Sequence, residues 1–126
     1  MGQFAHYLLP VPLSIEKLAA RGFNQSWELA KLIHCRSTIQ KSPYILKRHH
    51  YSKHQAGTSA AHRHLLIQGM FYIEPMHLEL LENKMVIVFD DVMTSGATLN
   101  EIASILKDNG VSRVINWVLL RTSRST

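Results

Sequence analysis

Apolar and polar positions alternate in blocks along this chain, and the blocks have lengths typical of strands and helices. Short apolar runs predict strands over residues 7–11, 44–47, 69–73, 85–89 and 114–120. Apolar residues at helical spacing predict helices over residues 14–20, 25–34, 58–66 and 98–109. Asn24 is a suitable N-cap for the second helix, and Gly110 is placed to end the last one.

This order of elements indicates the fold class. Strands that alternate with helices predict an α/β fold with a central, mostly parallel sheet and helices on both faces. The 126 residues, 46% of them apolar, suit a single domain over residues 1–126. In such a sheet, ligands bind beyond the carboxyl ends of the strands, where the strand order reverses.

Composition narrows the class of protein. No apolar run is long enough to span a bilayer, and the first residues lack the features of a secretory signal. We therefore expect a soluble, cytoplasmic protein without membrane insertion. The single cysteine, Cys35, excludes an internal disulfide and a cysteine-only metal site, and it reads as a small, partly buried thiol.

The most informative stretch is Val86–Thr98, VIVFDDVMTSGAT, where an apolar run stops at Asp90 and Asp91. A small, hydroxyl-rich turn follows and leads into a predicted helix; its residues are Thr94, Ser95, Gly96, Ala97 and Thr98. Backbone N–H groups at a helix N-terminus attract anions, and a carboxylate accepts hydrogen bonds from a sugar diol. The stretch predicts a site for a phosphorylated sugar. The alternative is an ordinary αβ connection; a P-loop is excluded because no Gly-Lys-Ser/Thr is present.

A second notable segment is basic. The chain has a net charge of +5, and residues 47–63 contain four Lys or Arg and four His but no acid. This segment indicates an anionic partner, either a phosphorylated small molecule or nucleic acid, unless it is a solvated loop face. Its histidines do not have the spacing of a four-ligand structural site, so we expect no metal held directly by a protein cluster.

A third segment places a cation, a glycine and two amides before a helix N-terminus: Arg21-Gly22-Phe23-Asn24-Gln25. Such a loop holds anions, although on residue types alone it is also compatible with a plain helix–helix turn with a surface arginine.

Together these segments resemble a known family. Val86–Thr98 resembles the phosphoribosyl pyrophosphate (PRPP) motif of type I phosphoribosyltransferases at every position. The order of a Pro-x-Pro loop, Arg-Gly-Phe-Asn-Gln, a Gln-x-Gly-x-Ser-x-x-x-Arg stretch and the PRPP motif is similar to that of the ComF/GntX family, from about Leu9 to Thr122. The family's usual Leu and Asn are replaced by Thr58 and Leu66. Its four-cysteine zinc segment is missing here, so no zinc is expected.

The resemblance implies a type I phosphoribosyltransferase fold that binds PRPP with Mg²⁺ and transfers phosphoribosyl to a nitrogen acceptor, in DNA uptake, competence or nucleotide salvage. The turn from Thr94 to Thr98 would hold the 5-phosphate, while Asp90 and Asp91 would bind the ribose hydroxyls. Arg21 and Gly22 would form the pyrophosphate loop. A flexible basic loop would close over the site through Lys53, His54 or Arg63. No catalytic base is visible.

Two other functions remain open. One is a PRPP-sensing module that binds the sugar phosphate without transfer. The other is an accessory protein of DNA uptake whose basic loop binds single-stranded DNA, although aromatic residues there are sparse for a stacking platform. The partners considered are therefore PRPP or a related phosphorylated sugar, single-stranded DNA, DNA-uptake proteins and a second copy of the chain.

Overall fold

The computed structural model describes residues 5–49, 69–93 and 96–121. Its central sheet has four parallel strands, in the spatial order β2 (Gln40–Lys41), β1 (Tyr7–Pro10), β5 (Met85–Met93) and β6 (Arg113–Arg121). A separate antiparallel pair is formed by β3 (Leu46–Arg48) and β4 (Phe71–Ile73). The described helices are α1 (Ile15–Arg21), α2 (Gln25–Leu32), α4 (Leu78–Leu81) and α5 (Ala97–Asp108), with a 3₁₀ turn η2 (Pro75–His77). The predicted α/β fold with a parallel central sheet is confirmed.

The two central strands are buried on both faces, which explains why they read as nearly continuous apolar runs. Two apolar clusters lie on opposite faces of the sheet, one with the buried residues of α5 and one with Ala30 of α2. In β1, Leu9 belongs to the first cluster and Leu8 to the second. In β5, Val88 and Phe89 divide in the same way. Alternate residues of a strand point to opposite faces, so these two strands separate two cores.

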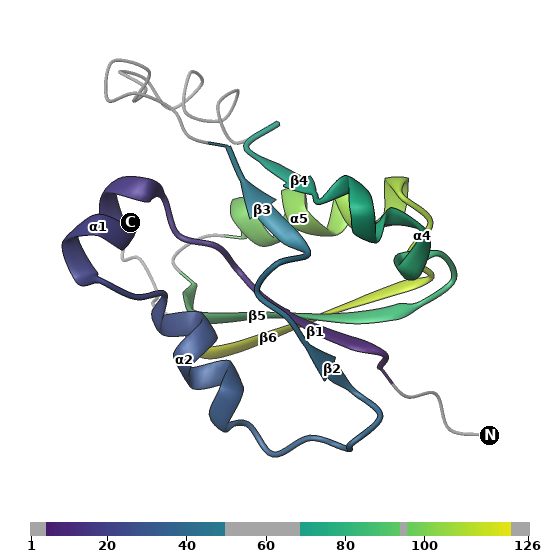
Figure 1. Ribbon diagram of the computed structural model, residues 1–126, viewed down its shortest axis with the longest axis horizontal. Coiled ribbons are helices and arrows are strands. Elements are labelled where there is room, and N and C mark those ends of the chain that lie inside the picture. Colours follow the sequence, from purple (N-terminus) through teal and green to yellow (C-terminus); the bar gives the residue numbers. More distant parts are fainter. Residues whose placement is uncertain (1–4, 50–68, 94–95, 122–126) are drawn as a thin grey trace.

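The two faces of the sheet are covered differently (Figure 1). On one face lie α5, α4 and the β3–β4 pair, while α2 lies on the other. α5 buries the predicted stripe of Leu99, Ile102 and Leu106, and Gly110 follows its end with φ +93°, a conformation that glycine adopts readily. α2 buries Ala30 completely.

Strand β6 forms one edge of the sheet and is incompletely covered on the α2 face. Trp117 is 39% exposed and Leu119 is 62% exposed. A mainly apolar pocket of about 460 Å³ lies beside them, between the end of α2 and the strands; it is lined by Ile33, Phe89, Asn116, Trp117, Val118 and Leu119.

Four predictions of secondary structure need correction. Strand β2 was not predicted, and the strand expected over residues 44–47 pairs with β4 outside the central sheet. The turn and helix over residues 75–81 were also not predicted. Strand β5 continues to Met93 instead of stopping at residue 89, because β6 pairs with it as far as Arg121. The helix predicted over residues 58–66 lies outside the described residues.

Within the described part of the chain, none of the helices combines the length and the apolar character needed to cross a membrane.

Candidate functional site at the carboxyl edge of the sheet

The candidate site lies where the strand order reverses. Strand β1 pairs with β2 on one side and with β5 on the other, and the chain leaves β1 toward β2 but leaves β5 toward β6. The connections after β1 and β5 therefore diverge at the carboxyl ends of neighbouring strands. This is the position at which parallel α/β sheets bind ligands.

The connection after β1 is organised by its own side chains and backbone. Ser14 caps α1 by accepting a hydrogen bond from the Lys17 N–H at 3.3 Å. Gly22 ends α1 with φ +82°, in the left-handed region that favours glycine, and its N–H donates to the Leu18 carbonyl at 2.7 Å. This motif fixes where the chain turns from α1 into α2.

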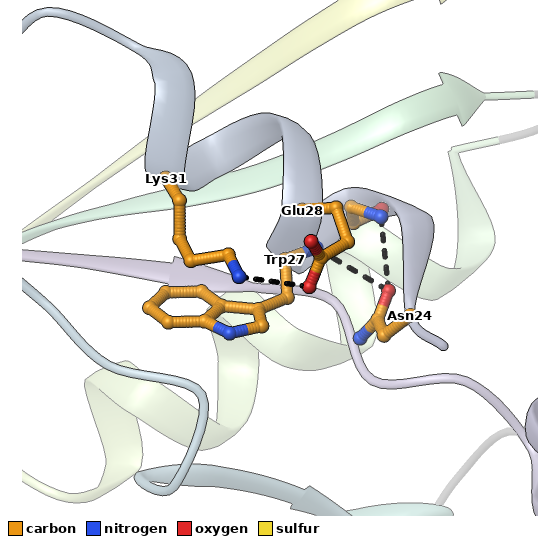
Figure 2. Close-up of polar contacts among 5 residues, drawn as sticks. Asn24, Trp27, Glu28 and Lys31 are labelled. Atoms are coloured by element: carbon orange, nitrogen blue, oxygen red, sulfur yellow. Dashed lines mark hydrogen bonds and ion pairs between the residues drawn. The ribbon is translucent and has the colours of Figure 1, made fainter. Parts of the chain in front are cut away.

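Asn24 starts α2 as predicted. Its side-chain oxygen accepts hydrogen bonds from the N–H groups of Ser26 at 2.9 Å and Trp27 at 3.4 Å, as Figure 2 shows. Its amide nitrogen donates to the Val11 carbonyl at 3.2 Å. One turn further along α2, Lys31 pairs with Glu28 at 2.9 Å and lies over the Trp27 ring (Figure 2). Asn24 therefore attaches the first turn of α2 to the end of β1.

The acidic pair contacts that same turn. The Ser26 hydroxyl lies 3.0 Å from Asp91 Oδ1 and 3.4 Å from Asp90 Oδ1, and the Asp91 N–H donates to Ser26 Oγ at 3.3 Å. Both carboxylates are half-buried, whereas Ser26 is only 3% exposed. Asp90 and Asp91 lie inside β5 rather than after it, because the ladder to β6 continues through Val118 and Leu120.

Burial and the neighbouring Asp91 change the ionisation of Asp90. Burial raises the pKa of Asp90 to about 6, and a hydrogen bond with Asp91 and the charge of that neighbour act in the same direction. The hydrogen bond from Ser26 opposes this rise in the pKa of Asp90. Near neutral pH, Asp90 is thus close to the point at which it gains or loses a proton.

The third part of the site is the N-terminus of α5. Gly96 occupies the N-cap position with no side-chain cap, and the first turn contains no acidic residue. The first intrahelical bond runs from the Asn100 N–H to the Gly96 carbonyl at 2.9 Å. The N–H groups of Ala97, Thr98 and Leu99 consequently have no carbonyl acceptor within the helix, and the helix dipole makes this end attractive to an anion.

The structure brings together some of the predicted site residues. Asp90 and Asp91 lie beside the connection after β1, and Gly96, Ala97 and Thr98 begin the helix that follows β5. Arg21 and Gly22 are exposed at the end of α1. Five further predicted residues lie outside the described residues: Thr94, Ser95, Lys53, His54 and Arg63. The binding roles of all the predicted site residues stay predictions.

Ser26 is the site residue that sequence reasoning missed. Its partners are 64 and 65 residues away in the chain, so no local pattern connects them. The available signal was its place in the first turn of a helix that begins at the connection after β1. Among the described residues, no group of three or more His, Cys, Asp or Glu side chains is placed to hold a metal ion.

The sequence of the chain is similar to those of known proteins. A family profile described as a phosphoribosyl transferase domain matches residues 29–126. The chain is 32% identical over 114 residues to Competence protein F of Haemophilus influenzae, covering 90% of this chain and 49% of that protein. It is 35% identical over 124 residues to DNA utilization protein YhgH of Escherichia coli K12, covering 95% of this chain and 51% of that protein. The chain thus spans about half the length of these relatives, and the expected ComF-type resemblance is confirmed.

The fold also matches a solved structure, that of the allosteric regulatory enzyme of purine biosynthesis. The TM-score is 0.54 at 19% sequence identity, and the match covers 94% of this chain and 23% of the other. At this identity the likeness concerns the fold, and it supports the type I phosphoribosyltransferase architecture predicted from the sequence.

Proposed function

Because the chain belongs to the phosphoribosyl transferase domain family, we propose that the carboxyl edge of its sheet binds PRPP together with Mg²⁺. The observation that carries the proposal is the half-buried pair Asp90 and Asp91, which lies at the strand-order reversal just before a helix whose N-terminus has no side-chain cap. These are the groups that a sugar carrying a phosphate requires: oxygen acceptors for its hydroxyls and N–H donors for its phosphate.

Each part of PRPP is assigned to one part of the site. The 5-phosphate accepts hydrogen bonds from the N–H groups at the start of α5, where Gly96 permits close approach. The 2- and 3-hydroxyls of the ribose donate to Asp90 and Asp91. The pyrophosphate lies toward the connection after β1, near Arg21 and Gly22, which are exposed.

Mg²⁺ prefers oxygen ligands, and we expect it to be held through the pyrophosphate oxygens of PRPP rather than by a cluster of protein side chains. Bound to PRPP, the ion would neutralise charge on the pyrophosphate. The protein's own residues then orient the ribose so that its C1 faces the acceptor. The C1–O bond to pyrophosphate breaks, its electron pair leaves with the pyrophosphate, and a nitrogen lone pair forms the new C1–N bond. Positioning and charge stabilisation supply the catalysis.

The test is titration calorimetry of the parent protein with PRPP, in the presence and absence of Mg²⁺, followed by an assay of pyrophosphate release with a panel of nitrogenous bases. We expect Mg²⁺-dependent binding and base-dependent release. Absence of PRPP binding would overturn the proposal. Binding without release for any base would assign the chain to the PRPP-sensing class instead.

Single-stranded DNA binding is a second candidate, favoured by the outer surface of the β3–β4 pair. Lys47 lies 5.7 Å from the centroid of the Tyr44 ring, and the rings of His49 and Tyr72 lie 4.4 Å apart at 32°. Tyr44 is 65% exposed. Aromatic rings interleaved with cationic groups stack bases and contact phosphates, and several relatives are named DNA utilization proteins.

The DNA candidate is tested by fluorescence anisotropy with a labelled oligo-dT at several salt concentrations. The Tyr44→Ala, Tyr72→Ala double variant should weaken binding by about tenfold or more, since stacking contributes roughly 1–3 kcal/mol per base. Lys107→Ala, an exposed lysine on α5, serves as the control. Binding that is insensitive to salt, or equal in the double variant, would exclude this surface.

A further inference from the structure

Among the described residues, Ser26 is the one polar residue that is buried. Its hydroxyl lies close to the carboxylates of Asp90 and Asp91. Ser26 is 3% exposed, and its Oγ contacts Asp91 Oδ1 at 3.0 Å and Asp90 Oδ1 at 3.4 Å. The same oxygen accepts the Asp91 N–H at 3.3 Å. A buried hydroxyl without partners is unfavourable, whereas this one is hydrogen-bonded in both directions.

The position of this hydroxyl is set by the start of α2. Ser26 donates its own N–H to the Asn24 side chain at 2.9 Å, and Asn24 in turn donates to the Val11 carbonyl at the end of β1. A continuous series of hydrogen bonds therefore runs from β1 through the α2 cap to the acidic pair on β5. A hydroxyl has one proton, so the shorter contact to Asp91 is the one it donates to most directly.

We propose that Ser26 is a positioning residue that orients Asp91, and through it Asp90, for ribose recognition, so that the connection after β1 controls the acidic pair on β5. This inference rests on the proposed function, since it deepens the role of the same site. By engaging one oxygen of Asp91, Ser26 restricts the orientation of this carboxylate. Preorganised acceptors of this kind bind without paying the cost of ordering at the moment of binding.

The electrostatic surroundings give Ser26 a second effect. Asp90 faces Asp91 on its own strand and Ser26 from α2. Its neighbour across the ladder to β6 is Val118, while the register of β1 ends one residue earlier, with Pro10 beside Phe89. Burial and the Asp91 carboxylate favour the protonated form of Asp90, and the Ser26 hydroxyl favours the ionised form. Removing the hydroxyl should therefore raise the pKa of Asp90 further above its present value.

The experiment compares Ser26→Ala with Ser26→Thr, which keeps the hydroxyl, and with Ser104→Ala, an exposed serine on α5 as a matched control. PRPP binding with Mg²⁺ is measured by calorimetry at pH 6.5, 7.5 and 8.5. We expect Ser26→Ala to bind about tenfold more weakly at pH 6.5, because the Asp91 carboxylate loses its hydrogen bond and more of Asp90 is protonated at that pH. The deficit should narrow at pH 8.5, while Ser26→Thr recovers most of the affinity and Ser104→Ala matches the parent.

A parallel measurement separates this inference from the proposed function. The carboxyl ¹³C resonance of Asp90 is followed against pH in the parent and in Ser26→Ala, without ligand. A higher midpoint in Ser26→Ala supports the positioning role even if the parent binds no PRPP, a result that would overturn only the proposed function. An unchanged midpoint overturns the inference. So does a loss of affinity of equal size at every pH, because a merely structural defect would not depend on the ionisation of Asp90.

Discussion

The two connections at the carboxyl edge of the sheet satisfy their polar groups in opposite ways. The connection after β1 is self-sufficient: Ser14 caps α1, Gly22 ends it, and Asn24 caps α2 while bonding back to Val11. The structure describes the connection after β5 except for residues 94–95. In the described part, the contacts come from another segment of the chain. Asp91 bonds to Ser26 of α2, and Gly96 gives α5 no side-chain cap.

This difference indicates a division of roles. A loop whose hydrogen bonds are internal keeps its shape regardless of ligand, so the connection after β1 acts as the support. The connection after β5 carries half-buried carboxylates, and within the described residues its helix begins at Gly96 without a side-chain cap. A bound ligand can therefore add hydrogen bonds there. We therefore expect substitutions of the capping residues of the first connection to alter stability, and substitutions of Asp90, Asp91 and Gly96 to alter binding. Ser26 is the exception in the first connection, because it contacts the acidic pair.

The largest expected effect comes from the acidic pair. Replacing both Asp90 and Asp91 with Asn removes charge but keeps the size of the side chains. PRPP affinity should fall by about 100-fold, because two hydrogen bonds from ligand hydroxyls to charged acceptors are weakened. The melting temperature should hold or rise as repulsion between the carboxylates is relieved. Calorimetry and thermal melts measure the two quantities.

A control for this variant is the exposed Asp108→Asn change on α5, which should leave both quantities unchanged. Outright unfolding of the double variant, or parental affinity for PRPP, would show that the acidic pair serves the fold and would erase the contrast between the two connections.

The next largest effect is expected at Gly96. Its φ of −82° is open to any residue, and among the described residues a Cβ there would meet the Asn100 side chain at 3.6 Å. Gly96→Val should therefore preserve the fold while its branched side chain keeps the phosphate from the backbone of α5. We expect an affinity loss of about tenfold, a smaller loss for Gly96→Ala, and little change in melting temperature. Equal PRPP affinity for Gly96→Val and the parent, measured by calorimetry, would refute phosphate binding at this helix end.

In the supporting connection, Asn24→Ala should act on stability. It removes the N-cap of α2 and the bond to Val11, so the free energy of unfolding should drop by roughly 1–2 kcal/mol. The neighbouring exposed residue gives a control, Gln25→Ala, which should be near neutral. Urea denaturation measures both. If Asn24→Ala unfolds at the parental midpoint, the first connection is not the rigid support described above.

The smallest effect is the pH dependence of stability. The pKa of Asp90 is about 6 in the folded protein and 3.8 as its reference value, so the folded state holds this proton more tightly. The resulting stabilisation is fully present below about pH 4 and is lost as the pH rises through about 6. Allowing for solvent screening of a part-exposed carboxyl, the loss should be about 1 kcal/mol. Urea denaturation between pH 4 and 7 should show this decline in the parent but not in Asp90→Asn; parallel curves would contradict it.

The sequence predicts those elements whose local pattern matches their tertiary environment. Strands β1 and β5 are apolar because both faces are buried, and α5 has its stripe because one side packs on the sheet. The cap at Asn24 was predictable because capping is a local interaction. The Val86–Thr98 motif predicted that the acidic pair lies near the carboxyl edge, because the strand, the pair and the following helix are consecutive in the sequence.

What the sequence did not predict depends on contacts between distant segments. Strand β2 is two polar residues, Gln40 and Lys41, whose extended form is fixed by pairing with β1. The sequence predicted a strand over residues 44–47 but not its antiparallel pairing with β4, because strand propensity does not specify the partner strand. The contact of Ser26 with Asp91 spans 65 residues, and it exists only because β1 and β5 are neighbours in the sheet.

The pairing of β1 with β5 also has a consequence for how the chain folds. The register places Tyr7 beside Val86 and Leu8 beside Ile87, so the centre of the sheet joins segments 79 residues apart in the chain. Such non-local parallel pairing is slow, because the entropy of closing a long loop is lost before the contact forms. During synthesis, β1 must wait until β5 has emerged. We expect Ser26 to meet the acidic pair only after that step, so that the environment of Asp90 reports the completion of folding rather than an early stage.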